Sequence, residues 1–413
     1  MGQPKSWFCT ILIVAGFSLA FFCSKPVQAA STEQVLYSFA GDEDGEYTDS
    51  DLILDSAGNI YGTTVQGGDF GSGTVFQVTS SGAHTVLYSF TGLADGGQPY
   101  KGVTLDAQGN LYGTTVVGGS FTGPCVEAGC GVVYKLTNSG GVWTQTVIHV
   151  FTGGSDGYGP GAGVTFDRRG NLYGMTPTGG AKGLGVIYQL KPTANGPWKE
   201  RVIHAFTGGS DGSTGSAGRL ILDAAGNFYG VATAGGANGS GTAFTLIPGS
   251  NGQWTFKTLF AFKGTPNAGF PYGALVFDTK GNLYGTTYYD GANNLGSVYR
   301  LANKNGVWSE SLLYSFKGGT DGSSPISNLV VDSAGNLYGT TSEGGAQCSC
   351  GTIFKLTPGA RGKWTETVVY RFQGPPDGAF VYNGMVADSA GNFYGATVHG
   401  GVDNEGAIYK FTP

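Results

Sequence analysis

Short apolar runs separated by glycine-rich turns extend over almost the whole chain. The clearest example predicts strands at 328–332, 337–341, 351–356 and 368–372, with a turn that contains Gly and Asn at 333–336. Segments of five or six residues are too short for helices, and their period-two alternation of apolar and polar side chains is typical of antiparallel strands. Each unit of this kind therefore predicts a sheet of four strands, here called a to d in chain order.

One phrase, Asp-x-x-Gly-Asn-(Leu/Ile/Phe)-Tyr-Gly, marks the turn between strands a and b and recurs seven times. Its tyrosines are Tyr61, Tyr112, Tyr173, Tyr229, Tyr284, Tyr338 and Tyr394. Successive tyrosines are 51 to 61 residues apart, which is close to the ~50-residue period of a four-stranded propeller blade. The sequence thus predicts an all-β fold, a seven-bladed β-propeller with four antiparallel strands in each blade.

The two ends of the repeat region predict how the ring closes. The first strand, at 35–39, has the d-type pattern, whereas the last strand, at 406–411, has the c-type pattern and no d strand after it. We therefore expect the N-terminal strand to close the last blade. Such closure leaves no free sheet edge, and free edges invite aggregation.

The repeat resembles a known family. The run Asp332-Ser-Ala-Gly-Asn-Leu-Tyr-Gly-Thr-Thr341, with Gly344-Gly345 and 351–357 after it, is similar to the GloVer-type (choice-of-anchor) tandem repeat. The resemblance covers residues 34–413 and implies an exported bacterial β-propeller, from a family without an assigned biochemical role. The fifth repeat departs from the pattern at 267–268 and 288–290.

The N-terminal segment predicts export. Lys5, an apolar run at 7–23 and Val27-Gln28-Ala29 fit a signal peptide at 1–29 that is cleaved after Ala29 or Ala30, with a transmembrane anchor as the alternative. Residues 30–413 then form the propeller, at about 55 residues per repeat, and leave no room for a second domain. We expect a secreted, periplasmic or cell-surface monomer with no membrane span after cleavage.

Charge and cysteines add two expectations. The formal net charge is −6 and no basic stripe follows the chain, so we do not expect nucleic acid as a partner. Cys125 with Cys130, and Cys348 with Cys350, form two close pairs in repeats that are not neighbours, which suits local disulfides in an oxidising compartment. A separation of two residues strains a disulfide, so the sequence leaves the bond between Cys348 and Cys350 open.

The long b–c and d–a connections should share one face of the ring, where propellers bind ligands. Six d–a loops carry an Asp-Gly pair, at Asp44, Asp95, Asp156, Asp211, Asp321 and Asp377. The motif turns add Asp55, Asp106, Asp167, Asp223, Asp278, Asp332 and Asp388. A ring of carboxylates could bind cations, but Asp-Gly is a common turn pair, and we favour a scaffolding role for both sets.

Candidate ligand-binding residues lie where single loops depart from the repeat. Tyr288, Tyr289 and Asp290 replace the small residues of the fifth b–c loop. The other candidates from b–c loops are Glu343, His399, Phe70 and Phe121. Aromatic side chains with scattered carboxylates suit stacking on sugar rings, and ordinary loop packing is the alternative for each residue.

No motif in the sequence indicates catalysis. Metal-ligand spacings, a Gly-x-Ser-x-Gly elbow and a Walker-type loop are absent, so no catalytic residue, metal or cofactor is assigned. An acid/base pair from Glu343, Asp290 and Asp403 is conceivable. Five tryptophans follow c–d turns and should pack at the rim of the opposite face, with a carbohydrate-contact surface as the alternative: Trp143, Trp198, Trp254, Trp308 and Trp364.

These observations favour one function and leave a second open. We favour a secreted, non-enzymatic propeller whose loop face binds extracellular glycan or protein. The alternative is a propeller polysaccharide lyase or glycoside hydrolase that uses carboxylates near the channel.

Overall fold

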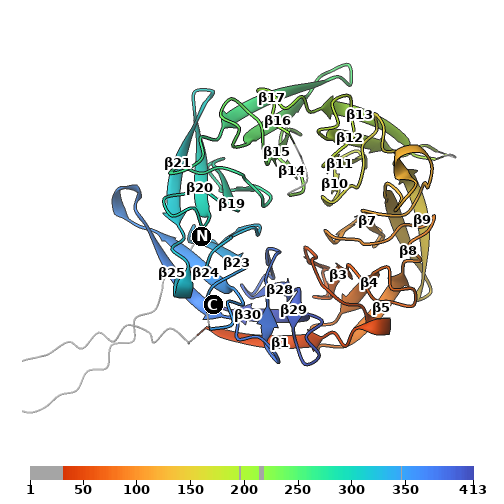
Figure 1. The fold of residues 1–413 in the computed structure, drawn as a ribbon, viewed down its shortest axis with the longest axis horizontal. Coiled ribbons are helices and arrows are strands. Elements are labelled where there is room, and N and C mark those ends of the chain that lie inside the picture. Colours follow the sequence, from red (N-terminus) through yellow and green to blue (C-terminus); the bar gives the residue numbers. More distant parts are fainter. Residues whose placement is uncertain (1–30, 195–196, 214–217, 346) are drawn as a thin grey trace, which may run out of the picture.

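Seven four-stranded antiparallel sheets surround a central axis (Figure 1). The computed structural model describes residues 31–413 except 195–196, 214–217 and 346. The first strands of a blade lie nearest the axis and its fourth strand lies at the rim (Figure 1). The predicted seven-bladed β-propeller is confirmed, and the predicted signal peptide at 1–29 falls outside the described residues.

Blades 1 to 4 each use four consecutive strands. Blade 1 contains β2 (Ile53–Leu54), β3 (Ile60–Thr64), β4 (Thr74–Val78) and β5 (His84–Ser89). Blade 2 contains β6 (Val103–Leu105), β7 (Leu111–Thr115), β8 (Val132–Ser139) and β9 (Val142–Val150). Blade 3 contains β10 (Thr165–Phe166), β11 (Leu172–Thr176), β12 (Val186–Lys191) and β13 (Lys199–Ala205). Blade 4 contains β14 (Ile221–Leu222), β15 (Phe228–Ala232), β16 (Thr242–Pro248) and β17 (Trp254–Ala261).

Blades 5 and 6 follow the same order, and blade 7 joins the two ends of the chain. Blade 5 contains β18 (Val276–Phe277), β19 (Leu283–Thr287), β20 (Ser297–Lys304) and β21 (Val307–Ser315). Blade 6 contains β22 (Val330–Val331), β23 (Leu337–Thr341), β24 (Thr352–Pro358) and β25 (Trp364–Arg371). Blade 7 contains β27 (Val386–Ala387), β28 (Phe393–Thr397), β30 (Ala407–Thr412) and β1 (Thr32–Ser38), beside a small sheet of β26 (Gly378–Ala379) and β29 (His399–Gly400).

The N-terminal strand closes the ring, as predicted. β1 pairs antiparallel with β30 from Thr32 opposite Thr412 to Ser38 opposite Ala407. Directly after β1, the backbone nitrogen of Phe39 donates to the carbonyl oxygen of Gly406 at 3.0 Å. The last sheet therefore has its fourth strand, and the ring has no open seam.

Strand a is shorter than the sequence predicts. β22 has two residues, whereas the pattern predicts a strand at 328–332. Asn328 is instead directed away from its own sheet, because its Oδ1 accepts a hydrogen bond from the backbone nitrogen of Ala274 in blade 5 at 2.6 Å. Near the axis the blades are close enough that contacts between them replace pairing within a sheet.

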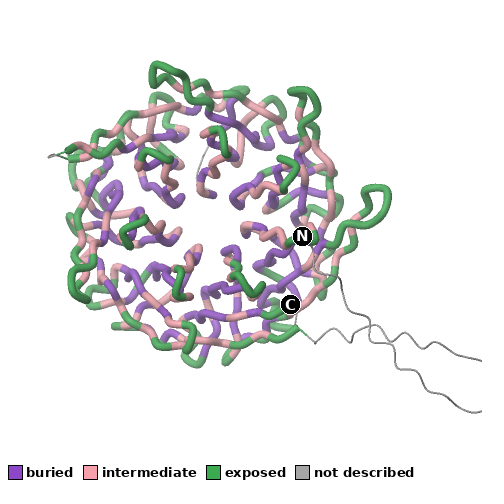
Figure 2. Tube along the Cα trace, turned by 180° about the vertical axis from the view of Figure 1, so that it is seen from behind, coloured by how far each residue is buried: buried purple, intermediate pink, exposed green. Residues whose placement is uncertain are grey.

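The apolar core lies between the blades. One cluster joins Tyr61 and Phe90 of blade 1 to Leu111 and Tyr134 of blade 2, and the other seams repeat this arrangement. The buried residues follow the inner strands of the ring, and the exposed residues follow its turns (Figure 2). Face-to-face packing thus buries both faces of each sheet.

The tryptophans at the rim clamp neighbouring blades together. The indole of Trp254 in blade 4 lies 5.4 Å, centroid to centroid, from the ring of Tyr173 in blade 3. Trp364 and Tyr284 repeat the contact between blades 6 and 5 at 6.1 Å. Rim packing is therefore confirmed for these tryptophans.

No helix in the described part of the chain is both long and apolar enough to cross a membrane.

Candidate ligand-binding site at the channel mouth

The b–c and d–a loops contact one another on one face of the ring, here called the loop face. Short bridges join each b–c loop to the d–a loop that leads into the same blade, for example Gln66 with Glu46 and Glu343 with Ser323. In blade 7 this bridge is extended into the pair β26 and β29. The two sets of long loops therefore form a single surface around the axis.

The repeated aspartates hold turns together. In the first motif turn, Asp55 Oδ1 accepts hydrogen bonds from the backbone nitrogens of Ala57 and Asn59, both at 2.9 Å. In the d–a loop before blade 2, Asp95 accepts the backbone nitrogen of Thr91 at 2.9 Å. The same backbone contact is made by Asp44, Asp156, Asp211, Asp321 and Asp377. The scaffolding interpretation of these carboxylates is confirmed.

The fifth repeat builds this turn in another way. Phe260 stands where other d strands have tyrosine or histidine, and Asn267-Ala268 stands where other loops have Asp-Gly. The missing carboxylate comes from Asp290, whose Oδ1 accepts the hydroxyl of Thr265 at 2.5 Å. Asp290 is only 7% exposed, so we leave it out of the ligand-binding surface.

Charged and polar side chains from several blades form a network that crosses the axis, here called the polar floor. Lys101 lies at its centre. Its Nζ donates to Asp49 Oδ1 at 2.9 Å and to Asn383 Oδ1 at 3.0 Å, which joins blades 2, 1 and 7. Burial alone would lower the pKa of Lys101, but the carboxylates of Asp49 and Asp51 outweigh burial and raise it. Lys101 therefore stays protonated and gives the polar floor a permanent positive charge beside Asp49 and Asp51.

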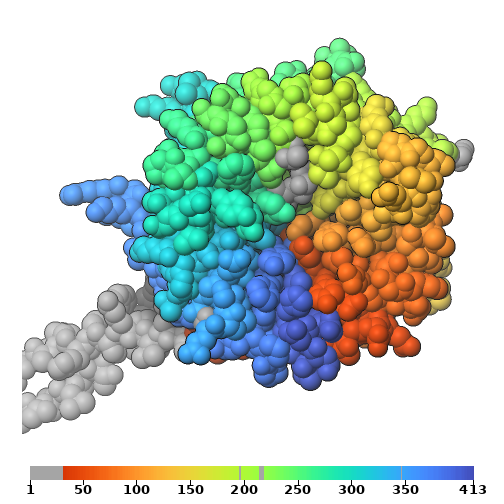
Figure 3. Space-filling model, in the orientation of Figure 1, coloured from red at the N-terminus to blue at the C-terminus, as the bar shows by residue number. Residues whose placement is uncertain are grey.

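Asp51 is the second residue of the polar floor that contacts several blades. Its Oδ1 accepts Asn328 Nδ2 from blade 6 at 3.1 Å, and its Oδ2 lies 3.9 Å from Arg219 Nε of blade 4. Arg219 also donates to Thr104 Oγ1 of blade 2 at 3.2 Å. The ribbon leaves a gap at the axis (Figure 1), but atoms cover most of it in the space-filling view from the same side (Figure 3).

Three tyrosines stand at the edge of this floor. Tyr100, Tyr272 and Tyr382 each lie six residues before a motif aspartate, in blades 2, 5 and 7. Burial and the charge of Asp49 raise the pKa of Tyr100 and Tyr382. All three side chains are partly exposed, and within the described part of the chain their hydroxyls have no hydrogen-bond partner. Sequence reasoning missed these tyrosines, although their constant offset from the motif would have identified them.

Tyr288 and Tyr289 extend the aromatic cluster over blade 5. The ring of Tyr288 lies 6.0 Å from Tyr272 and 4.0 Å from Tyr289, centroid to centroid. A hydrogen bond to Tyr289 and burial raise the pKa of Tyr288 to about 12, and the charge of Glu343 adds to this effect. Tyr289 is 47% exposed and Glu343 is exposed as well. The side chains around the polar floor are called the channel mouth from here on: Tyr100, Tyr272, Tyr288, Tyr289, Glu343 and Tyr382.

The remaining predicted residues lie elsewhere on the loop face. His399 packs between Tyr47 and Phe380, with ring centroids 5.1 and 5.7 Å away. Phe70 and Phe121 are 60% and 40% exposed, and neither contacts another aromatic ring among the described residues. The structure brings Tyr288, Tyr289 and Glu343 together, but it does not join His399, Phe70 or Phe121 to them.

Both cysteine pairs are bonded. Cys125 and Cys130 have their Cα atoms 5.1 Å apart in blade 2, and Cys348 and Cys350 have theirs 5.2 Å apart in blade 6. The pairing that the sequence left open is therefore present. Disulfides are compatible with an extracellular protein.

The aspartates at the channel are turned to other groups of the protein. Asp49 binds Lys101, Asp51 binds Asn328, and Asp290 is buried in its own loop. In the described residues, no group of three or more His, Cys, Asp or Glu side chains is placed to hold a metal ion. Among the described residues, the channel mouth presents aromatic faces, phenol hydroxyls and the carboxylate of Glu343, which has no cation partner.

A family comparison agrees with the repeat analysis. The Gloeobacter/Verrucomicrobia repeat matches residues 24–126, 125–346 and 255–413. The chain belongs to this family. The resemblance drawn from the motif is thus confirmed, and the repeat family accounts for the whole propeller. No curated protein matches this Gloeobacter/Verrucomicrobia repeat protein in sequence.

Three solved structures are similar to this repeat protein at low identity. A proposed 6-phosphogluconolactonase from Bacteroides uniformis has a TM-score of 0.51 at 12% identity, over 78% of this chain and 86% of the other. A gluconolactonase from Xanthomonas campestris has a TM-score of 0.43 at 12% identity, over 92% and 89%. A proposed glucose dehydrogenase from Thermus thermophilus has 0.46 at 13%, over 93% and 100%. At 12% identity the likeness to the Bacteroides uniformis structure shows a similar fold and nothing of activity.

Proposed function

We propose that this protein is an exported, non-enzymatic propeller that binds an extracellular neutral glycan at the channel mouth. The observation that supports this most strongly is the clustering of Tyr272, Tyr288 and Tyr289 on the loop face, which also carries the partly exposed Tyr100 and Tyr382. The apolar faces of sugar rings stack on aromatic side chains, and sugar hydroxyls need donors and acceptors nearby.

The electrostatics of the mouth favour a neutral ligand. The cations Lys101 and Arg219 are matched by Asp49 and Asp51, so the floor carries no excess positive charge. Among the described residues, Glu343 is the one charged side chain of the mouth without an ion-pair partner, and its Oε2 accepts a long hydrogen bond, 3.4 Å, from Ser323. A carboxylate can accept hydrogen bonds from sugar hydroxyls, whereas it would repel an anionic sugar.

The enzymatic alternative requires a second carboxylate. Glycoside hydrolases that use two carboxyl groups keep them ~5–9.5 Å apart on either side of the scissile bond. In the part of the chain that the structure describes, Glu343 is the one carboxylate of the mouth that forms no ion pair, and Asp403 lies in the b–c loop of blade 7. Binding without turnover therefore agrees better with the geometry than a lyase or hydrolase does.

A glycan array followed by reducing-end assays tests the proposal. We expect binding to a neutral glycan without release of new reducing ends. Combined Tyr272→Ala and Tyr288→Ala substitutions should weaken that binding by about tenfold or more, because aromatic anchors dominate such contacts. The matched control is Phe70→Ala with Phe121→Ala, which removes two exposed aromatics from the same face but outside the mouth.

Three results would overturn the proposal. Unchanged affinity in the double tyrosine variant would place the site elsewhere. New reducing ends would make the protein an enzyme. Absence of any bound glycan would leave a protein partner as the better explanation of the loop face.

Export is part of the same proposal. The predicted signal peptide at 1–29 and the two disulfides support it. Mass spectrometry of protein recovered outside the cytoplasm should find a mature chain that begins at Ala30 or Ser31. An intact N-terminus on that protein would contradict cleavage.

A further inference from the structure

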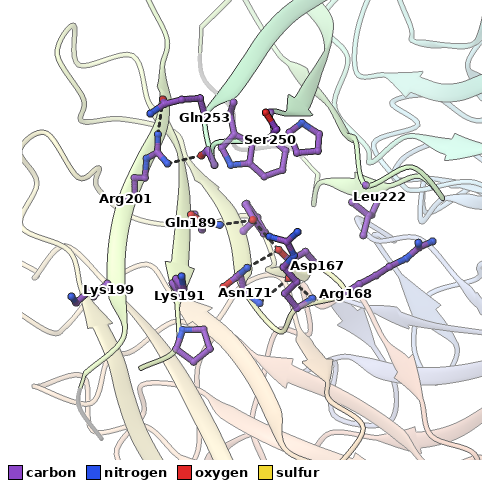
Figure 4. Close-up of a pocket in the computed structure, with 18 of the residues that line it drawn as sticks. Asp167, Arg168, Asn171, Gln189, Lys191, Lys199, Arg201, Leu222, Ser250 and Gln253 are labelled. Atoms are coloured by element: carbon purple, nitrogen blue, oxygen red, sulfur yellow. Dashed lines mark hydrogen bonds between the residues drawn. The ribbon is translucent and has the colours of Figure 1, made fainter. Parts of the chain in front are cut away.

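The opposite face, which carries the a–b and c–d turns, contains a basic groove between blades 3 and 4. Its volume is about 900 Å³. We call it the basic groove, because five of the 22 lysines and arginines of the chain line it: Arg168, Arg169, Lys191, Lys199 and Arg201. This concentration of positive charge is unexpected in a protein whose formal net charge is −6. Figure 4 labels four of them, Arg168, Lys191, Lys199 and Arg201, around the groove.

Strand register aligns the basic residues of blade 3. Lys191 of β12 lies opposite Lys199 of β13, and Gln189 lies opposite Arg201. Alternate residues of a strand share a face, so Lys199 and Arg201 point to the same side as Lys191. The a–b turn of blade 3 adds Arg168 at the inner end of this row (Figure 4).

Most of these cations have no partner in the protein. Within the described residues, no carboxylate lies within ion-pair distance of Arg168, Arg169, Lys191 or Lys199. Arg201 is held across the seam, because its guanidinium donates to Gly252 O at 2.8 Å and to Gln253 Oε1 at 3.0 Å. The unpaired charges are exposed and free to meet an anion.

The two acids in the groove do little to offset this charge. Asp167 is turned to its own loop, where it accepts the backbone nitrogen of Arg169 at 2.8 Å and Asn171 Nδ2 at 2.7 Å. Burial, with a smaller effect of Asp156, raises the pKa of Glu200 to about 7. The groove is therefore positive at neutral pH.

One wall of the groove is aromatic. Trp254 is half-buried, lines the groove from blade 4 and packs against Tyr173 at 5.4 Å. An indole beside arginines suits a ring that is apolar on its face and anionic at its edge, because arginine binds carboxylate and sulfate groups in a planar, bidentate manner. Such rings occur in acidic polysaccharides.

The blade itself departs from the repeat at this point. Five of the other six motif turns have Ser-Ala, Ala-Gln or Ala-Ala where blade 3 has Arg168-Arg169, and blade 5 has Thr279-Lys280. The turn conformation does not require arginine, since Ser56-Ala57 forms the same hydrogen bond to its motif aspartate. The two arginines are thus unexplained by folding.

We propose that the basic groove between blades 3 and 4 is a second binding site, which takes an acidic polysaccharide with carboxylate or sulfate groups. The site is independent of the channel mouth and lies on the opposite face of the ring. A polysaccharide fits better than a nucleic acid, because among the described residues the groove offers Trp254 as its one partly exposed aromatic side chain, whereas a nucleic-acid strand needs a row of aromatic side chains on which successive bases stack.

The test uses the mature protein with polygalacturonate and with dextran sulfate, followed by isothermal titration calorimetry at several salt concentrations. Binding to at least one of them is expected, with an affinity that falls as salt rises. The variant Arg168→Ser with Arg169→Ala gives blade 3 the turn that blades 1, 6 and 7 already have, so it should fold normally. Its affinity should be about tenfold lower, with a smaller salt dependence.

A charge-matched control distinguishes binding in the basic groove from non-specific electrostatic attraction between the polysaccharide and the protein surface. Lys280→Ala with Lys363→Ala also removes two exposed cations, from turns of blades 5 and 6 outside the groove. That control should bind as the unmodified protein does. Equal losses in both variants, no binding of either polysaccharide, or tighter binding of single-stranded DNA than of both polysaccharides would overturn the proposal.

Discussion

The glycine that follows each motif tyrosine is required by an aromatic ring packed over it. A Cβ atom at Gly113 would lie 2.4 Å from the Tyr134 hydroxyl, and one at Gly339 would lie 2.6 Å from the Phe354 ring. No real Cβ contact is so short, so a larger residue would force the ring out of the core. The glycine of the motif is therefore a packing requirement of the core.

The packed ring is phenylalanine in some blades and tyrosine in others. The hydroxyls of Tyr134, Tyr188, Tyr299 and Tyr409 are buried and have no hydrogen-bond partner among the described residues. Tyr→Phe substitution at each of these sites should raise the free energy of unfolding by about 1 kcal/mol, because it removes an unsatisfied polar group. Urea denaturation of the single variants measures this change.

Tyr61→Phe is the matched control for that experiment. The Tyr61 hydroxyl donates to Asp55 at 3.1 Å and accepts Gln77 Nε2 at 2.9 Å. Its loss should lower the free energy of unfolding by about 1 kcal/mol. If Tyr134→Phe destabilises the protein as much as Tyr61→Phe does, the packing account of the tyrosine hydroxyl is wrong.

Sequence reasoning was uneven at the residue scale. The turn roles of the aspartates could be predicted, because each carboxylate bonds to backbone within four residues in the chain. The channel mouth could be predicted only in part. Tyr100, Tyr272 and Tyr382 come from blades 2, 5 and 7, and the hydrogen bond that ties Asp290 to its own blade comes from Thr265, which lies 25 residues away in the chain.

Among the elements, β1 has the largest effect on closure. It covers the outer edge of β30, and the fully buried Phe39 follows it. A chain that begins at residue 41 should lose soluble, monomeric protein or melt at a much lower temperature, since the exposed edge can pair with other chains. Size-exclusion chromatography and thermal melting test this prediction, with a chain that begins at residue 31 as the control.

A peptide in trans makes the same test more specific. Addition of a synthetic peptide of residues 31–41 should restore the monomer and much of the melting temperature of the shortened chain, because the peptide can occupy the vacant edge of β30. Normal melting of the shortened chain without peptide would show that β1 is dispensable.

Element lengths were harder to predict than element order. The sequence predicts the number of strands and the ring closure because the motif and the alternation are local. Strand a is short because its residues are drawn into contacts across the axis, as Asn328 shows with Ala274 and Asp51. The basic groove escaped sequence analysis for a similar reason, since its cations are spread over residues 168–201 and meet only when two strands and a turn align.

The whole ring contains buried acids at several blade seams. Burial, with the nearby charge of Asp377, Asp156 or Asp321, raises the pKa of Glu33, Glu200 and Glu366 to about 7 in each case. One carboxylate oxygen of each lacks a hydrogen-bond partner in the described residues. The folded state therefore holds a proton on these glutamates that the unfolded chain releases near pH 4.5.

This predicts how stability changes with pH. A raised pKa in the folded state contributes stability below pH 4.5, and that contribution is lost as pH rises through about 7. The unmodified protein should therefore lose stability from about pH 5 to about pH 8, relative to the triple variant Glu33→Gln, Glu200→Gln and Glu366→Gln. The free energy of unfolding of the variant minus that of the unmodified protein should be larger at about pH 8 than at about pH 5. Urea denaturation at both pH values gives the difference.

The comparison with the triple variant isolates the glutamates from the histidines. Burial lowers the pKa of His84 to about 4 and also lowers that of His149, so both oppose the glutamates as pH falls below 6.5. Both histidines are retained in the triple variant, and their effect cancels in the difference. Parallel pH profiles for the two proteins would mean that the seam glutamates are ionised in the folded state.

The central claim is that the two faces of the ring bind different carbohydrates through separate residues. The most direct measurement is the dissociation constant of the neutral glycan, determined for the Tyr272→Ala, Tyr288→Ala variant and for the Arg168→Ser, Arg169→Ala variant. The account predicts a loss of about tenfold or more in the first variant and no change in the second. Full affinity in the first variant, or an equal loss in both, would contradict it.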